Sequence, residues 1–392
     1  MAIPRVRPGN YPAILSYGFR PFFFAGSVYA GGAILFWLPL LYGHLETSSL
    51  FAPIDWHVHE MLFGYVAAVI TGFLLTAIPN WTGRLPVQGL PLFGLVALWL
   101  IGRPAVFFSS EIGWLAAALL DCAFLAAVAI AAATEIIAGR NWRNLKVLAP
   151  VSVLLAANLL FHVEVQYSGV SDYGKRLGIA AIVVLIMIIG GRIIPSFTRN
   201  WLVRENPGRL PVPFNRLDTA AIVVSALALA FWTVLPDAPA SGVALLVAAI
   251  VNVLRLARWA GHRTLRDPLV LILHLAYAFV PLGLFLAGLS AFSGAVPAAA
   301  GIHAFGAGAI GAMTLAVMVR ATLGHTGQEL RAGKSACVIF AAVILAALAR
   351  IAASFSGSPE LLTHLSAALW AIAFLGYAAR YGRSLFRPRI RA

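Results

Sequence analysis

Histidine is the residue type through which this chain could do chemistry. The sequence has nine histidines, and six of them lie within or at the ends of long apolar stretches. Each buried ionisable group costs on the order of a few kcal/mol, so packing alone explains six of them poorly. Imidazole nitrogens bind iron, copper and zinc. The six are His57, His59, His162, His274, His303 and His325.

The order of the apolar stretches predicts that four of these histidines share one depth. His57 and His59 begin the second apolar stretch at the outer face of the membrane, and His162 ends the fifth stretch at the same face. His303 lies in the tenth stretch, about one to two helical turns below that face. We therefore predict a metal site among these four residues. On a regular helix His57 and His59 point in different directions, so they would serve different centres, or one would orient a neighbouring ligand.

Two carboxylates belong to the same layer. Glu60 follows His57 by three residues and shares its helical face, and Glu164 follows His162 by two residues. A carboxyl group beside a metal site can relay protons, so Glu60 and Glu164 are the candidate catalytic residues. Interfacial side chains that reach water would explain both glutamates equally well.

A second group of residues is expected near the opposite, cytoplasmic face. The histidines of this group suit a haem, and arginines bind the carboxylates of a haem through two parallel hydrogen bonds. Arginines that only mark the cytoplasmic side and extend toward water are the alternative explanation. The candidate cofactor-binding residues are Arg20, Arg192, Arg320, His274 and His325.

Membrane-spanning helices have to position these side chains. Apolar residues make up 61% of the 392 residues and charged residues 11%, against about 25% in soluble domains. A span needs about 20 mostly apolar residues, and about twelve stretches qualify, the third interrupted at Arg103–Pro104. The predicted fold is an all-α polytopic membrane protein. The spans are residues 20–42, 57–78, 91–109, 112–138, 145–166, 176–198, 217–235, 240–260, 268–291, 298–320, 335–355 and 360–381.

The basic residues alternate between loops. The chain has 28 Lys and Arg against 14 Asp and Glu, and the excess lies in short loops between the apolar stretches rather than in a nucleic-acid-binding patch. Loops rich in Lys and Arg stay in the cytoplasm. Even-numbered loops and the C-terminal tail are basic, whereas residues 43–56 contain neither Lys nor Arg. Twelve spans with both termini in the cytoplasm satisfy this pattern.

Several functional motifs are absent from the sequence. It has no phosphate-binding loop, no nucleophile elbow and no H-E-x-x-H. It has no C-x-x-C-H, which excludes covalent haem attachment through the usual motif. Cys122 and Cys337 are far apart and predict no disulfide framework. We expect no cleaved signal peptide, since no small-residue cleavage site follows a short apolar core.

A short motif recurs at the ends of two predicted spans, as IPNWT at residues 78–82 and IPSFT at residues 194–198. The tenth span ends with LGHTG at residues 323–327. Because these ends lie four spans apart, they suggest one transmembrane domain, residues 1–392, with a pseudo-threefold repeat of four-helix units. The units are roughly residues 1–140, 141–260 and 261–392. Transporters also contain repeats, so the repeat does not select a function.

Four motifs together resemble the NnrS family. They are YGFRPFF at residues 17–23, WHVHEMLFG at 56–64, GGRIIP at 190–195 and MTLAVMVRATLGHTG at 313–327. The resemblance covers essentially the whole chain, although Val58 stands where alanine is common and Gln328 where arginine is expected. It implies a bacterial inner-membrane protein that contains haem and copper and acts in nitric oxide metabolism and nitrosative stress.

The histidines and the resemblance together give one functional hypothesis. We expect a haem b protein that binds nitric oxide at the outer histidine layer, where copper or non-haem iron would be held. Whether it also reduces nitric oxide, as a nitric oxide reductase-like oxidoreductase, stays open, and the sequence does not identify an electron donor. The alternative is a multi-span transporter or metal-handling protein without redox chemistry.

The alternation of basic loops leads to a test of topology. A reporter enzyme that is active only outside the cytoplasm should be active when fused after Ser48 and inactive when fused after Arg387. Enzyme assays on intact cells measure this directly. Activity at both positions, or at the tail alone, would contradict twelve spans with two cytoplasmic ends.

Overall fold

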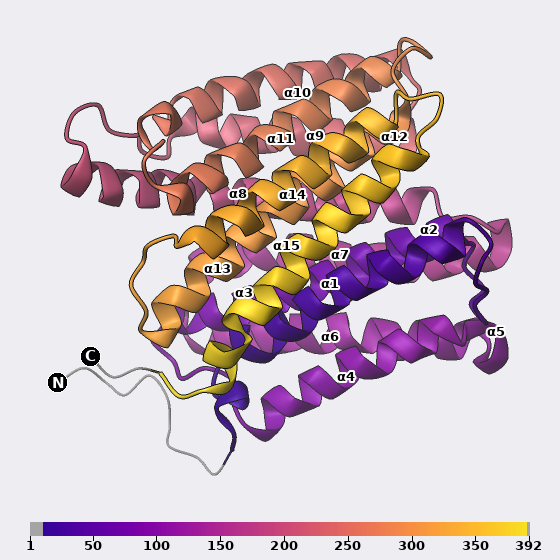
Figure 1. Ribbon diagram of the computed structural model, residues 1–392, viewed down its shortest axis with the longest axis horizontal. Helices are drawn as coiled ribbons and strands as arrows, with labels where there is room; N and C mark the ends of the chain where they lie inside the picture. The colour runs from indigo at the N-terminus through magenta and orange to yellow at the C-terminus, as the bar shows by residue number, and fades with distance from the viewer. Residues whose placement is uncertain (1–10, 390–392) are drawn as a thin grey trace. The chain divides into compact units, whose positions relative to one another are not determined.

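The computed structural model describes residues 11–389, which are mainly helical and contain no strand (Figure 1). Within these residues, twelve helices are long and apolar enough to cross a membrane. The predicted all-α polytopic fold is therefore confirmed. The helices are α1 (Phe19–Leu41), α2 (Pro53–His59), α3 (Ala67–Thr82), α4 (Leu90–Phe107), α5 (Ser109–Ile112), α6 (Trp114–Ala138), α7 (Leu148–Ser168), α8 (Tyr173–Glu205), α9 (Arg216–Val234), α10 (Pro239–Ala257), α11 (Pro268–Ser290), α12 (Ala298–His303), α13 (Ala312–Thr326), α14 (Lys334–Ala353) and α15 (Glu360–Phe386).

Two of the spans contain a π-helical segment. A π-helical segment, Glu60–Val66, joins α2 to α3, and a second one, Ala304–Gly311, joins α12 to α13. Each begins directly after a histidine, His59 in the first span and His303 in the second. Because π-helices are rare and concentrate at functional sites, these two segments mark places where side chains are redirected from regular α-helical positions.

The chain divides into two compact units. The first unit consists of Met1–Gly178, Met318–Glu329 and Phe374–Ala392, and the second of Ile179–Val317 and Leu330–Ala373. This division does not test the predicted repeat of three four-helix units, which stays a prediction. Within the first unit α4 packs along α6, α6 along α7, and α1 along α3.

The third span differs from its prediction. The sequence predicted an interruption at Arg103–Pro104, but α4 continues through both residues to Phe107. Arg103 is buried and paired with carboxylates of the same unit, so it has no need to reach water at a helix end. The turn that the sequence indicated around Glu111 is present at the short helix α5, and Gly113 after it takes a φ of 86° that allows the chain to turn into α6.

A buried polar network ties three helices of the second unit together. Arg255 on α10 donates from Nε to Asp218 of α9 at 2.9 Å and from Nη1 to the Tyr277 hydroxyl of α11 at 2.7 Å. Tyr277 donates to Asn252 Oδ1 at 2.8 Å, and Asn252 donates to Ser225 Oγ at 2.8 Å. Loss of one partner from a buried charged pair strongly destabilises a protein, because the other charge is left unpaired in an apolar surrounding. The stability of this network therefore depends on its close packing.

Two adjacent glycines of α8 lead to a prediction about this network. A Cβ atom on Gly191 would lie 1.9 Å from Arg255 Nη2, whereas a Cβ atom on Gly190 would meet nothing closer than 3.5 Å. Gly191→Ala should therefore displace Arg255 and lower the free energy of unfolding by about 1–3 kcal/mol. Gly190→Ala, the matched control, should be neutral or mildly stabilising because alanine favours the helix. Thermal unfolding in detergent measures both, and equal melting temperatures would contradict the account.

Candidate metal centre

Two histidines and an aspartate meet in the interior of the first unit. His59 ends α2, Asp121 lies within α6, and His162 lies in the last third of α7. One possible ligand atom from each lies within 4.8 Å of the others, and in residues 11–389 they form the one such group of three or more His, Cys, Asp or Glu. Their exposed fractions are 0%, 1% and 2%. The group is therefore sealed from water.

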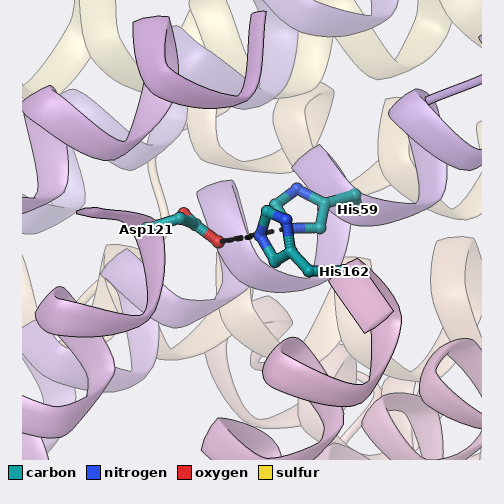
Figure 2. Close-up of side chains that lie close together, drawn as sticks. All are labelled: His59, Asp121 and His162. Atoms are coloured by element: carbon teal, nitrogen blue, oxygen red, sulfur yellow. Dashed lines mark hydrogen bonds and ion pairs between the residues drawn. The ribbon is translucent and has the colours of Figure 1, made fainter. Parts of the chain in front are cut away.

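Both imidazole rings are directed at the same carboxylate oxygen. His59 Nε2 and His162 Nε2 each lie 3.2 Å from Asp121 Oδ2, and Figure 2 shows the two rings facing the aspartate from one side. Two imidazole nitrogens and one carboxylate oxygen form a donor set typical of zinc and of non-haem iron. The arrangement can hold a metal ion with three protein ligands.

An asparagine completes the contacts of the aspartate. Asn158 precedes His162 by one turn of α7 and donates from Nδ2 to Asp121 Oδ2 at 2.8 Å. Its carbonyl oxygen Oδ1 lies 3.0 Å from His59 Nε2. Asn158 is 1% exposed. Both polar atoms of this amide thus face the metal-binding group.

An arginine connects the aspartate of the group to a second carboxylate. Arg103 of α4 donates from Nη1 to Glu60 Oε2 at 2.5 Å and from Nη2 to Asp121 Oδ1. Glu60 also accepts a hydrogen bond from the Tyr29 hydroxyl, and its Oε1 lies 2.9 Å from His59 Nδ1. One positive charge is therefore shared between two buried negative charges.

The surroundings of His59 test whether a metal ion fits. Its Nδ1 faces the Glu60 carboxylate, and its Nε2 faces oxygen atoms of Asp121 and Asn158. A neutral imidazole carries a single N–H, so one ring nitrogen would direct its lone pair at oxygen. A second proton or a metal ion at Nε2 removes this conflict. A histidine that donates its other N–H to a carboxylate is the usual arrangement around metal ligands, so the residues present fit a metal.

Two glycines leave the space for these side chains. Gly64 follows Glu60 by about one helical turn, and a Cβ atom there would be 2.8 Å from Glu60 Oε2 and 2.7 Å from Arg103 Nη1. Gly102 likewise leaves room for Asp121, because a Cβ atom there would be 2.9 Å from Asp121 Oδ1. The Gly64 carbonyl accepts a hydrogen bond from Trp99 Nε1 at 2.8 Å, which fastens the segment to α4.

The other residues of the predicted outer layer are not members of this group of three. The ring of His57 stacks on Trp37 with centroids 4.2 Å apart, so it points away from His59, as its two-residue spacing predicted, and its role as a metal ligand stays a prediction. His303 belongs to the second unit, and its place in this layer stays a prediction. The Glu164 carboxylate accepts hydrogen bonds from Ser171 Oγ, Tyr173 N and Gly174 N at 2.7–2.8 Å at the start of α8, and its catalytic role stays a prediction.

The predicted cofactor-binding residues are divided between the units. In the first unit, Arg20 Nη1 donates to three backbone carbonyls at the end of α15, those of Ser384, Leu385 and Arg387. The ring of His325 lies 5.5 Å from the ring of Tyr17 and 5.4 Å from that of Phe19. Arg320 is half-buried. In the second unit lie Arg192, which is half-buried, and His274.

The ring of His274 is closely packed at both of its nitrogens. Its Nε2 lies 2.8 Å from Thr198 Oγ1. On the other side of the ring, a Cβ atom added to Gly261 would be 2.6 Å from Nδ1, so the backbone of Gly261 covers that nitrogen. A haem ligand at His274 would require Thr198 to turn away, and its role stays a prediction.

Sequence reasoning missed the residues that organise the centre, namely Asp121, Arg103, Asn158 and Tyr29. Asp121 carried a usable signal, because it is the one charged residue in the middle of the span 112–138. An ionisable residue at such a place is a candidate functional residue with a nearby partner. Asn158 and Tyr29 carried no comparable signal, since neutral polar side chains are common in spans.

Comparison with known proteins gives a family. No curated protein matches the chain. Residues 13–389, nearly the whole chain, match the family described as NnrS protein. The match includes every residue of the metal-binding group and of the network around it. The chain belongs to the NnrS family.

Proposed function

We propose that this protein binds nitric oxide at a metal ion held by His59, Asp121 and His162. One observation carries the proposal: two imidazole nitrogens converge on one oxygen of a buried carboxylate, with a second carboxylate behind one of the rings. The link of the NnrS family to nitric oxide and metals supports the choice of ligand. When bound, iron or copper would supply a coordination position for nitric oxide in addition to its protein ligands.

The wall of the site suits a small neutral molecule. The ring of Phe51 lies 4.9 Å from that of His59 and 5.1 Å from that of His162, and Phe63 and Phe161 lie 5.1 and 5.2 Å from His59. These apolar rings exclude water and offer no hydrogen bond to a charged substrate. Nitric oxide, which is uncharged and soluble in lipid, could reach such a site through the membrane.

Glu60 is the residue we propose for proton transfer. Reduction of two nitric oxide molecules to nitrous oxide and water takes two electrons and two protons. Glu60 contacts both His59 and the Tyr29 hydroxyl, so it can receive a proton through Tyr29 and hold it beside the metal-binding group. Arg103 would keep Glu60 directed at His59 while it stabilises Asp121 as a ligand. Turnover is a further step of the proposal, because it also needs an external redox partner that supplies the two electrons.

Haem b is proposed on the family link alone. We propose Arg20, Arg192, Arg320, His274 and His325 as the residues to examine for it, and we derive no step through haem. We also propose the bacterial inner membrane as the location, with both termini in the cytoplasm.

Substitution of the three ligands tests the proposal. His59→Ala, Asp121→Asn and His162→Ala should each lose most of the bound metal and the spectral change caused by nitric oxide. His57→Ala, a histidine outside the group, should keep both. Elemental analysis, pyridine haemochrome spectra and absorption spectra with added nitric oxide measure this on detergent-purified protein.

The outcome separates the two candidate functions. Ligand variants that stay monodisperse and keep both metal and the nitric oxide response would exclude the proposed centre. Metal binding without any nitric oxide response would favour the metal-handling protein instead. A b-type haemochrome spectrum that survives in the ligand variants would place haem away from the three ligands.

A further inference from the structure

The amide of Asn158 has a fixed orientation. Nδ2 donates to Asp121 Oδ2 at 2.8 Å, and Oδ1 lies 3.0 Å from His59 Nε2. A flipped amide would place its oxygen against the carboxylate oxygen of Asp121, which is unfavourable in a buried site. The carbonyl oxygen of Asn158 is therefore directed at the place where the ligand atoms converge.

Three distances between these atoms are close to the edge length of a tetrahedral metal site. Ligand atoms at bond lengths of about 2.0–2.1 Å lie about 3.3 Å from one another around a tetrahedral ion. His59 Nε2 and His162 Nε2 lie 3.2 Å from Asp121 Oδ2, and Asn158 Oδ1 lies 3.0 Å from His59 Nε2. Three edges thus have nearly the length that one shared ion requires.

We propose that Asn158 is a fourth protein ligand through its carbonyl oxygen, which completes a set of two nitrogens and two oxygens. The inference rests on the proposed metal centre. Carbonyl and carboxylate oxygens suit divalent iron, zinc or cobalt better than copper(I), which prefers softer ligands. Asn158 and His162 are one turn apart on α7, so this helix supplies half of the set and holds the two ligands rigidly.

Cobalt(II) is the probe for this ligand, because its visible bands report coordination number and geometry. The full-length protein in detergent would be stripped with a chelator and titrated with cobalt(II). The wild type should give the intense bands of a four-coordinate ion. Asn158→Leu, which keeps the volume and loses the oxygen, should shift and weaken these bands and lower the affinity by about 10–100-fold. Asn158→Gln, which keeps the amide group on a longer side chain, should keep more of the affinity and of the band intensity than Asn158→Leu.

Two controls separate the inference from the proposed function and from general destabilisation. Asn252→Leu removes an equally buried asparagine of the second unit and should leave the cobalt spectrum unchanged. A spectrum that depends on His59 but is the same in Asn158→Leu would overturn the role of Asn158 and keep the metal centre. A wild type that gives no cobalt spectrum would overturn both.

Discussion

The paired contact of Arg103 with Glu60 and Asp121 is the interaction on which the centre depends. Two carboxylates buried in an apolar interior repel each other and lose their hydration, and one guanidinium group offsets both costs through charged hydrogen bonds. Removal of one partner from such a pair typically destabilises a protein by roughly 3–5 kcal/mol. Arg103 also fixes both carboxylates in space. Glu60 is thereby held against His59 Nδ1, and Asp121 presents its other oxygen to the two imidazole rings.

The backbone around this contact is built to admit it. Glu60 and Arg103 pass over Gly64, and Asp121 passes beside Gly102, at distances that a Cβ atom would block. Glu60 begins the π-helical segment Glu60–Val66, and Gly64 follows it by about one turn on the same helix. Local helix geometry, glycine positions and the charged contact therefore support one another. The same principle recurs in the second unit, where Gly191 leaves room for Arg255.

The sequence predicted the spans and two of the three proposed ligands, and its errors have physical causes. Apolar length identifies a helix, and topology assigns a residue its depth, which is how His59 and His162 were placed together. Depth does not give the direction in which a side chain points around the helix, and packing decides it: His57 turns toward Trp37. The apparent break at Arg103–Pro104 was the buried arginine of the network, because a charge in a span looks the same whether it ends the helix or pairs inside it. Glu164 was predicted at the same depth as the histidines, but its carboxylate accepts hydrogen bonds from the backbone at the start of α8.

X-ray absorption spectroscopy at the metal edges of the purified protein tests the central claim most directly. The fine structure reports the number of imidazole rings on each metal. The account predicts a non-haem metal with two imidazole ligands and oxygen scatterers at about 2.0–2.2 Å, which becomes a metal with one imidazole, or no metal, in His162→Ala. A metal with no imidazole ligand, or one whose imidazole count is unchanged when His162 is replaced, would contradict the assignment of the centre to His59, Asp121 and His162.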